Sequence, residues 1–585
     1  MLRLCALAAV AMLLLAACGP AAEASPTPTR PPTPLTGATP PPTTTPTPAG
    51  PGATPAATPK PTPTAAPAVP GTPQPRYGGV LKFSTPADPD RFDRLRNITG
   101  DTAVRDAWDL VFSKFIEFEW PKKGDASCSR PLFAHAAESW QWKGNTLEIK
   151  LRPGIKFHPK APVNGRELTA EDAAWSLNRA KAEQARFSEY LDSVSEIKAV
   201  DRYTLNMVSQ APTLALLYGV LASYYGSTPT AKESAGKDGG WDDPDRSWIG
   251  TGPFMFKAWR PGVKITLERN PSYFKPGLPY LSGVEMLVLP DGATRMALLR
   301  SGVLELDTYK KSAVTVQAIQ ATNPDIRVSK CPATDGIGTI QIRNDLPPWT
   351  DVRVRRALFL AIDQDAIIKS VLQGEGFPSG AILHTMILGL TSREDYPPEV
   401  RKYLYANPTE AKKLLAEAGF PNGFDTTLEF TRYYGSPWNE AAEAVQSMLN
   451  NAGIRAKLVW LERGRYNAQR GNQDALLISS ASAPEPWHRL VSYPCDQEPG
   501  INRSRVCDRE VTDKLLKEFN LATDETRVKE IIRLLMVRWV DQAYFYSLPA
   551  PFYYLVGQPR LRNFDNGDGQ GQYITPLFEQ LWMAQ

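Results

Sequence analysis

Residues 351–363 read Asp351-Val-Arg-Val-Arg-Arg-Ala-Leu-Phe-Leu-Ala-Ile-Asp363. Apolar side chains recur in this stretch with the i, i+3, i+4, i+7 spacing of one helix face, at Val354, Ala357, Leu358 and Ala361. Asp351 is suited to cap this helix, and Asp363 is suited to begin a second helix that runs to Leu372. The stretch therefore predicts two short consecutive helices, the first with an apolar face.

Outward from these helices, strand and helix patterns alternate through the second half of the chain. Strands are expected at 338–342, 426–430, 454–461, 476–479 and, rich in aromatic residues, at 544–555. Helices are expected at 407–419, 440–452 and 527–543, the first with Asn407 as N-cap and Gly419 as its stop. Such alternation is typical of layered α/β proteins, so we expect an α/β fold.

The first half carries turn and cap signals. Residues 147–157 are expected to form two strands around the Pro153-Gly154 turn. Thr169-Ala-Glu-Asp172 is a capping-box signature that begins a helix. Gly250-Thr-Gly-Pro253 supplies turn geometry ahead of a strand at 264–269. We therefore expect short strands combined with capped helices in this half.

The N-terminal segment is typical of an export signal. Arg3 supplies positive charge, and the apolar run at 4–17 is shorter than the roughly 20 residues that span a bilayer. Leu15-Ala-Ala-Cys18 is similar to a bacterial lipobox, in which the cysteine is diacylated and the chain is cut before it. An ordinary secretory signal is the alternative. We expect removal of residues 1–17 and a lipid anchor on Cys18, because two acyl chains give firm anchoring.

Residues 19–75 consist mainly of Pro, Thr, Ala and Gly, with three charged side chains and no aromatic one. Such a segment cannot bury enough apolar surface to offset the entropy of ordering. Residues 18–75 are therefore expected to be a lipidated, disordered tether with a reach of at most about 170 Å. A glycosylated spacer is the alternative. The remainder, roughly 510 residues, should form two or three lobes.

Charge and motifs exclude several classes of function. Lys and Arg total 66 and Asp and Glu 62, so the 585-residue chain carries a net charge of only +4. A protein that mainly binds nucleic acid would need a basic face, so no nucleic-acid partner is expected. The Gly-x-Ser-x-Gly, His-Glu-x-x-His and glycine-rich phosphate-loop motifs are absent. We therefore expect no catalytic residue and no cofactor.

The cysteines and histidines point to a disulfide and not to a metal site. Cys495 and Cys507 flank a short polar loop, and disulfides persist in exported proteins, so a local bridge is predicted, with two free thiols as the alternative. Cys128 and Cys331 are too distant in sequence for a pairing to be assigned. No Cys-x-x-Cys pair occurs and the four histidines are scattered, so no metal site is expected. His488 is more typical of a solvated polar residue than of a nickel ligand.

Four blocks of sequence resemble family 5 of the ABC-transporter solute-binding proteins, the peptide, nickel and opine group. The blocks are 151–157 with 168–172, 250–253 through 268–271, 351–357 with 361–363, and 407–419. They occur in order behind the lipobox and span about residues 78–555. Most of these residues are better explained as turns, caps and hinge faces than as ligand contacts.

The resemblance implies a two-lobe periplasmic-binding-protein-like fold with an extra subdomain inserted in the first lobe. Lobe I would comprise 76–330 and 545–585, and lobe II would comprise 331–544. The inserted subdomain would lie at about 113–245. The two crossings between the lobes would lie at 331–340 and 546–554.

The resemblance also places a wall of the ligand cleft after the strand at 476–479. Peptide-binding members carry an aspartate there, upstream of a Glu-Pro or Asp-Pro pair, that holds the peptide α-amine. This chain has Glu485-Pro486, but the matching position is Ser482, which cannot supply a charge. The candidate ligand-binding residues of this segment are Ser480, Ser482, Ala483, Glu485 and Trp487. Either Glu485 replaces the aspartate, or the ligand is not a free-amine peptide.

Three further side chains are candidates for ligand contact. Tyr433 and Tyr434 would suit a cleft, because ligand sites favour aromatic walls with a few polar groups. Ordinary packing is the simpler explanation of either tyrosine. Asp88, with Asp90 beside it, is the nearest alternative charge anchor, and turn capping is its simpler explanation.

Together these observations favour an extracytoplasmic substrate-binding lipoprotein of an ABC importer. It would capture a peptide or peptide-like solute by hinge closure and deliver it to the permease. We expect a monomer held at the cell membrane by its lipid, with the permease and a small-molecule ligand as partners. The alternatives are a lipoprotein that binds a nickel chelate, an opine or an oligosaccharide, or one with a sensory or adhesive role. An exported hydrolase is the least favoured reading.

Overall fold

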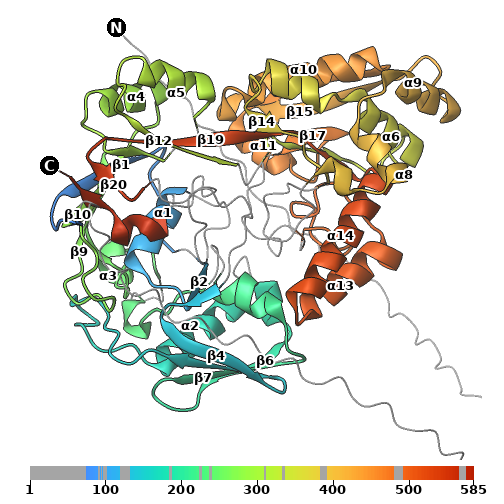
Figure 1. Cartoon of the computed structure of the whole chain (residues 1–585). Coiled ribbons are helices and arrows are strands. Elements are labelled where there is room, and N and C mark those ends of the chain that lie inside the picture. Colours follow the sequence, from blue (N-terminus) through green and yellow to red (C-terminus); the bar gives the residue numbers. More distant parts are fainter. Residues whose placement is uncertain are drawn as a thin grey trace, which may run out of the picture. The chain divides into compact units, whose positions relative to one another are not determined.

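The structure is a computed structural model, in which three sheets carry the architecture (Figure 1). It describes residues 74–89, 92–93, 95, 102–118, 132–183, 188–222, 227–235, 240–308, 311–332, 336–381, 392–479, 490, 492–564 and 575–584. The predicted signal segment, Cys18 and the tether up to residue 73 lie outside the described residues.

An eight-stranded sheet is built from segments that lie far apart in the sequence. Its strands are β1 (Val80–Thr85), β8 (Phe254–Arg260), β9 (Lys264–Arg269), β10 (Gly283–Val288), β11 (Leu306–Asp307), β12 (Arg327–Pro332), β14 (Gly376–Phe377) and β19 (Ala550–Gly557). The order is β12-β19-β11-β1-β10-β9-β8, and β14 pairs with β19. β1 runs parallel to β10 and β11, and the long β12 and β19 run antiparallel side by side (Figure 1).

Helices and aromatic side chains cover this sheet. Its helices are α1 (Thr102–Val111), α3 (Pro244–Ser247), α4 (Gly292–Arg300) and α5 (Ala313–Gln320). Phe83 of β1 is fully buried and meets Phe578 edge to face, with ring centroids 5.1 Å apart. The short strands β20 (Leu561–Arg562) and β21 (Trp582–Met583) pair with each other near the C-terminus. The C-terminal segment therefore contributes to the core around β1.

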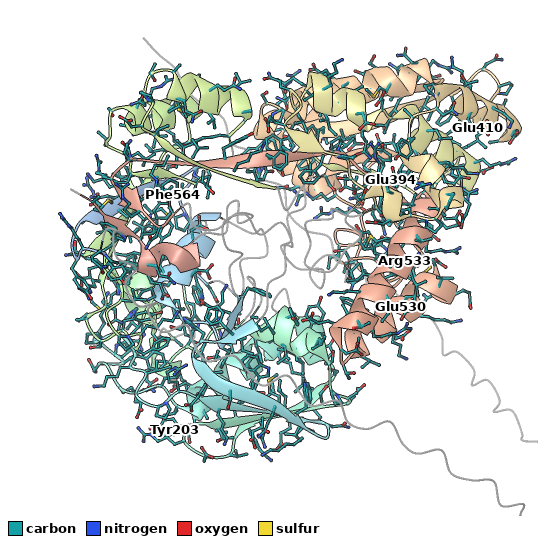
Figure 2. All side chains as sticks on the ribbon, viewed as in Figure 1. Tyr203, Glu394, Glu410, Glu530, Arg533 and Phe564 are labelled. Atoms are coloured by element: carbon teal, nitrogen blue, oxygen red, sulfur yellow. A yellow bond between two sulfur atoms is a disulfide. The ribbon has the colours of Figure 1, made fainter. Side chains whose placement is uncertain are left out.

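A five-stranded sheet occupies the second half of the chain. Its strands are β13 (Thr339–Ile342), β15 (Phe424–Thr431), β16 (Ile454–Leu461), β17 (Leu476–Ser479) and β18 (Phe545–Ser547), in the order β16-β15-β17-β13-β18. Its helices are α6 (Val352–Ala361), α7 (Gln364–Ser370), α8 (Pro398–Arg401), α9 (Pro408–Glu417), α10 (Trp438–Asn451), α11 (Arg463–Gln469), α13 (Lys514–Leu521) and α14 (Glu525–Gln542). Side chains fill the layers between them (Figure 2). The alternation predicted from the sequence is confirmed.

Helix α6 begins where the sequence predicts. The Asp351 carboxylate accepts a hydrogen bond from the backbone N–H of Arg353, and the predicted apolar face is buried. Arg355 is buried as well, because its guanidinium donates to the carbonyl oxygens of Trp349 (2.7 Å), Thr350 (3.0 Å) and Gln542 (3.0 Å). The guanidinium thus joins the start of α6 to the end of α14.

A four-stranded antiparallel sheet lies between β1 and β8 in the sequence. Its strands are β4 (Ala137–Lys143), β5 (Thr146–Leu151), β6 (Val194–Ala199) and β7 (Thr204–Ser209), in the order β4-β5-β7-β6. Helix α2 (Ala170–Ala182) begins at the predicted capping box of Thr169 and Asp172. A separate pair, β2 (Ile116–Phe118) and β3 (Leu132–Ala134), is antiparallel.

The second strand predicted within 147–157 is wrong. β5 ends at Leu151, and Gly154 then turns the chain with φ of +81°. Ile155 and Phe157 are buried, but their backbone groups bond to the loop at 166–168 and not to a sheet. Because alternate residues of this loop are apolar and buried, its sequence pattern is the same as that of a strand.

Two short segments carry the chain between the larger sheets, and β14 in addition joins the eight-stranded sheet by pairing with β19. The chain leaves the eight-stranded sheet after Pro332 and enters the five-stranded sheet at Thr339. It returns between Ser547 and Ala550. β18, which we expected in the returning segment of lobe I, pairs instead with β13 through Thr339 and Ser547. The return therefore begins at residue 548 and not at residue 545.

Candidate ligand-binding site

Three loops leave the five-stranded sheet at one edge. β15 runs parallel to both β16 and β17, with Thr431 opposite Leu461 and Glu429 opposite Leu477. The carboxyl ends of the three strands therefore coincide. Ligands of open α/β sheets bind at the carboxyl ends of parallel strands. The segments 432–434 and 462–463 follow two of these ends and lie at such an edge, and β17 ends there at Ser479.

Both crossings leave from this same edge. β13 is antiparallel to β17 and β18, and Thr339 lies opposite both Ser479 and Ser547. Since β13 begins at Thr339 and β18 ends at Ser547, the described residues 336–338 and 548–549 of the crossings lie beside the end of β17. A ligand at this edge would lie next to the connections between the two sheets.

The principal predicted segment cannot be placed. Ser480, Ser482, Ala483, Glu485 and Trp487 lie outside the described residues, as does His488. The residue before them, Ser479, is buried and accepts a hydrogen bond of 2.9 Å from the side-chain amide of Gln341. Gln341 in turn accepts one of 2.6 Å from the Ser504 hydroxyl. The start of the segment is therefore fixed, and ligand contact by its members stays a prediction.

The two predicted tyrosines lie at the edge but are not equivalent. They belong to a turn of 3-10 helix (Arg432–Tyr434), in which the Thr431 hydroxyl accepts from the Tyr433 N–H. Tyr434 packs on Phe430 with parallel rings 5.9 Å apart, whereas Tyr433 is 51 % exposed. Tyr434 therefore serves the core as well as the edge, and Tyr433 is free to meet a ligand.

Two arginines at this edge were missed by the sequence reasoning. The guanidinium carbon of Arg463 lies 3.4 Å from the ring centroid of Tyr433, and that of Arg432 lies 4.1 Å from the ring centroid of Trp460. Neither forms an ion pair with a carboxylate of the described chain. An arginine within two residues of the end of a parallel strand, which both positions show, is the signal that could have identified them.

The neighbouring acid, Glu462, is engaged elsewhere. Its carboxylate caps α11 by accepting from the backbone N–H groups of Gly464 (2.7 Å) and Arg465 (3.3 Å). These bonds hold the pKa of the Glu462 carboxyl below its usual range. The carboxylate thus stays ionised and stabilises the helix start.

Asp88 follows β1, whose carboxyl end coincides with those of β10 and β11 in the eight-stranded sheet. One of its carboxylate oxygens accepts from the indole N–H of Trp259 (3.0 Å), and the other accepts from the backbone N–H of Gly262. Both oxygens therefore hold the β8–β9 hairpin, as the turn-capping alternative anticipates. Ligand contact by Asp88 stays a prediction, and Asp90 lies outside the described residues.

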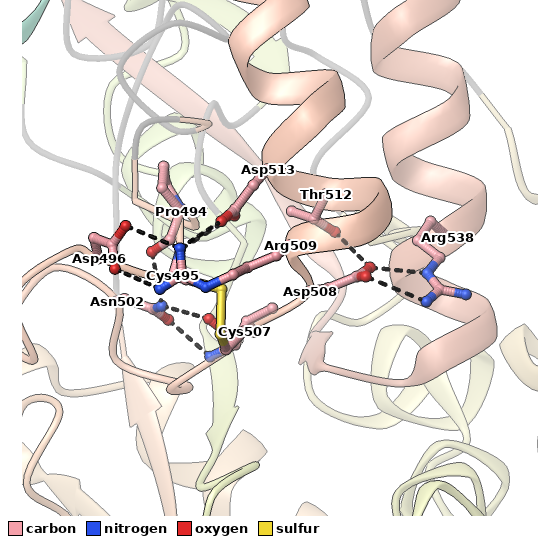
Figure 3. Close-up of a disulfide and its surroundings, with 11 residues drawn as sticks. Pro494, Cys495, Asp496, Asn502, Cys507, Asp508, Arg509, Thr512, Asp513 and Arg538 are labelled. Carbon is pink, nitrogen blue, oxygen red and sulfur yellow. Dashed lines mark hydrogen bonds and ion pairs between the residues drawn. A yellow bond between two sulfur atoms is a disulfide. The ribbon is translucent and has the colours of Figure 1, made fainter. Parts of the chain in front are cut away.

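A disulfide closes the loop that follows the principal segment. Cys495 is bonded to Cys507, 12 residues later (Figure 3). The backbone N–H of Cys495 donates to Asp513, and Asp508 beside Cys507 forms an ion pair of 2.9 Å with Arg538 of α14. The disulfide loop is thereby attached to helices of the five-stranded sheet.

No group of three or more His, Cys, Asp or Glu side chains in the described ranges is arranged to hold a metal ion. No described helix combines the length and apolar character needed to cross a bilayer.

The fold is that of the two-lobe periplasmic binding proteins. A solved structure with this fold is the ABC transporter-associated periplasmic binding protein DppA from Helicobacter pylori, in complex with the peptide STSA. It superimposes with a TM-score of 0.70 at 22% sequence identity, covering 87% of this chain and 99% of that chain.

Sequence comparison defines the family. Residues 132–494 match the model for bacterial extracellular solute-binding proteins, family 5 Middle. Di/tripeptide-binding protein 1 of Pseudomonas aeruginosa (strain UCBPP-PA14) is 28% identical over 485 residues, 78% of this chain and 86% of the relative. Heme-binding protein A of Haemophilus influenzae is 30% identical over 446 residues, 72% of this chain and 78% of the relative. The chain belongs to family 5 of the bacterial extracellular solute-binding proteins.

Proposed function

We propose that the protein captures a peptide or peptide-like solute outside the cytoplasmic membrane and delivers it to the permease of an ABC importer. One observation carries the proposal. The carboxyl ends of β15, β16 and β17 meet the two crossings at a single edge. A ligand bound there can touch both sheets, and it then stabilises the state in which they approach each other.

We take the crossings as the hinge. Lobe I is proposed as 76–330 with 548–585, and lobe II as 331–544 together with the three residues of β18, which pair with β13. The four-stranded sheet lies within the inserted subdomain proposed at about 113–245. Short connections such as 548–549 absorb the backbone rotation of a hinge, while the packed sheets move as units.

The relatives support a peptide but do not restrict the ligand to one. Two of them are named for peptides, and a third is named for haem. In this chain, Ser482 stands where the resemblance expects the carboxylate that holds a peptide α-amine. A neutral hydroxyl makes a weaker bond to an ammonium group than a carboxylate does. A peptide-like ligand without a free amine is therefore an equal candidate.

Ser482→Asp tests the amine site. Isothermal titration with free-amine dipeptides should show tighter binding to the variant than to the wild type, with N-acetylated peptides as the control. Unchanged affinity would show that Ser482 is not at the amine anchor.

A test for enzymatic activity is independent of this site. Incubation of the protein with peptide and ester panels should give no products. If the wild type forms products and a single substitution abolishes their formation, a purely binding role is contradicted.

We also propose that Cys18 is diacylated and anchors the receptor to the membrane through the tether. The support is the Leu-Ala-Ala-Cys sequence after an apolar run. Labelling of cells with a fatty-acid analogue should mark the wild type and not Cys18→Ala. Equal labelling of the two proteins would reject the anchor and leave ligand binding untouched.

A further inference from the structure

We infer that the site takes a ligand with two acidic groups, one held by Arg432 and the other by Arg463. This inference rests on the proposed function, because it names the ligand class of the same site. It begins from two positive charges at the carboxyl edge of β15 and β16 that the described chain leaves without acidic partners.

Most arginines of the same region are neutralised. Ion pairs with N–O distances of 2.6 to 2.9 Å are formed by Arg343 with Asp345, Arg353 with Asp351, Arg356 with Asp541, Arg393 with Asp365, Arg401 with Glu394, Arg455 with Asp425, Arg509 with Asp496 and Arg538 with Asp508. Within the described residues, Arg432 and Arg463 form no ion pair, as is also true of Arg465, Arg470 and Arg505, but only these two lie over an aromatic ring at the carboxyl edge of β15 and β16. Their charge is available to a ligand.

The stacked geometry leaves the hydrogen-bonding edges open. A guanidinium that lies on an aromatic ring uses its face, whereas its N–H groups point outward in its own plane. Arg463 is held in this way by Tyr433, and Arg432 by Trp460. A carboxylate can then bind such an edge through two parallel hydrogen bonds.

Arg463 also carries an unsatisfied donor. Its Nη1 atom is buried and has no hydrogen-bond partner in the described chain. A buried donor without an acceptor is unfavourable, and an ionised acceptor removes the cost most effectively. The nearest acid in sequence, Glu462, caps α11 instead. The acceptor is therefore expected to come with the ligand.

Strand register sets the two cations near each other. Thr431 and Leu461 pair across β15 and β16, so Arg432 and Arg463 lie one and two residues beyond neighbouring strand ends. Adjacent strands are about 4.8 Å apart. Two acidic groups on one small molecule can span such a separation. An acidic dipeptide, with a terminal and a side-chain carboxylate, meets this requirement.

Two dipeptides of nearly equal shape test whether the site prefers a ligand with a second negative charge. Ala-Glu and Ala-Gln differ by one negative charge, and titration calorimetry gives both dissociation constants. The wild type should bind Ala-Glu at least tenfold more tightly, with the preference falling as salt is added. In Arg463→Gln the preference should drop below threefold. Arg465→Gln is the matched control: Arg465 is exposed on the same helix without a described ion pair, and its loss should preserve the preference.

Each remaining outcome has a defined meaning. Equal binding of the two peptides by the wild type would overturn the inference and leave peptide capture intact. If neither peptide binds, capture of free-amine dipeptides fails, and thermal shifts with dicarboxylates and their monoamides decide the inference. No stabilisation by any dicarboxylate would overturn it. If Arg463→Gln does not fold, Arg463→Lys takes its place in the test. Lysine keeps the positive charge but lacks the paired N–H groups of the guanidinium, so this variant should retain only part of the preference for Ala-Glu.

Discussion

The hydroxyl of Tyr218 donates a hydrogen bond of 2.6 Å to Oε1 of Glu525, a residue 307 positions later in the chain. Two further bonds join the same segments: the N–H of Leu214 donates to the Ala522 carbonyl (2.9 Å), and the Thr213 hydroxyl donates to the Asn520 carbonyl (2.5 Å). Tyr218 lies in the proposed inserted subdomain, and Glu525 begins α14 in proposed lobe II. The four-stranded-sheet region and the helices of the five-stranded sheet therefore touch at a place distant in sequence from the crossings, which in the proposed division is a contact between the lobes.

Loss of the Tyr218 hydroxyl should favour separation of the lobes. Tyr218→Phe keeps the ring and removes a bond to a charged group, a change of about 1 to 2 kcal/mol. We expect a larger radius of gyration by X-ray scattering of the ligand-free protein and roughly five- to thirtyfold weaker ligand binding.

Tyr203→Phe is the control for this prediction. The Tyr203 hydroxyl donates to Glu167 (3.0 Å) next to the four-stranded sheet, and no partner in lobe II is involved (Figure 2). Its loss should leave both measurements unchanged. Equal effects of the two variants would show that Tyr218 has no special part in closure.

Acid should destabilise the protein through His158. Burial lowers the pKa of its imidazole from 6.5 to about 4. One ring nitrogen lies 3.1 Å from the Gly252 carbonyl and the other accepts from the Gly250 N–H, a pattern that only the neutral ring satisfies. The unfolded chain binds a proton below pH 6.5 and the folded chain does not. Stability is therefore lost as the pH falls from 6.5 to 4, by up to about 3 kcal/mol.

The variant His158→Gln separates the contribution of His158 to the acid-induced loss of stability from the contribution of the carboxylates. Calorimetric melting at pH 7 and at pH 4 should show a smaller acid-induced loss in the variant, because glutamine does not titrate. Parallel loss in the two proteins would show that His158 is protonated when folded, or that its region does not limit unfolding.

Arg355 should matter for stability far more than Arg353, although both lie in α6. Arg355→Met leaves three carbonyl oxygens without their donor and should cost about 3 kcal/mol. Arg353 pairs with Asp351 at the surface, and Arg353→Met should cost about 1 kcal/mol or less. Denaturant unfolding of both variants checks the difference. A similar loss in both would mean that the carbonyl contacts of Arg355 are dispensable.

The disulfide between Cys495 and Cys507 should stabilise the helices to which its loop is attached. Closing a loop of this length stabilises a protein by about 3 kcal/mol in the chain-entropy model. The double variant Cys495→Ala/Cys507→Ala should melt several degrees lower than the wild type. Reducing agent should lower the melting temperature of the wild type alone. Insensitivity of the wild type to reductant would argue against the bond.

Local patterns predicted the local elements well. Asp351 and Asn407 cap helices where expected, and β17 has the predicted bounds. Such features depend on residues within one or two turns of each other. The pairing of β14 with β19 could not be predicted, because it joins Gly376 to Pro551 and no pattern in either short segment specifies the other.

The site was predictable only in part for the same reason. The tyrosines at 433 and 434 were predicted as candidates, and the register places them just beyond the carboxyl end of β15, where ligand contact stays a prediction. The role of Asp88 depends on Trp259 and Gly262, which lie 171 and 174 residues away. Arg432 and Arg463 became candidates only when the structure showed which other arginines are paired. For Asp88 as for the two arginines, the role depends on contacts with residues that a local sequence pattern does not reveal.

Hydrogen–deuterium exchange most directly tests the central claim that a ligand is held at the carboxyl edge of β15, β16 and β17. It should compare the empty protein with the protein bound to the small molecule that mass spectrometry recovers from purified material. We predict ligand-dependent protection at residues 431–434, 461–464 and 480–489, with the small molecule recovered unchanged. Protection confined to other segments, or chemical conversion of the small molecule, would contradict the claim.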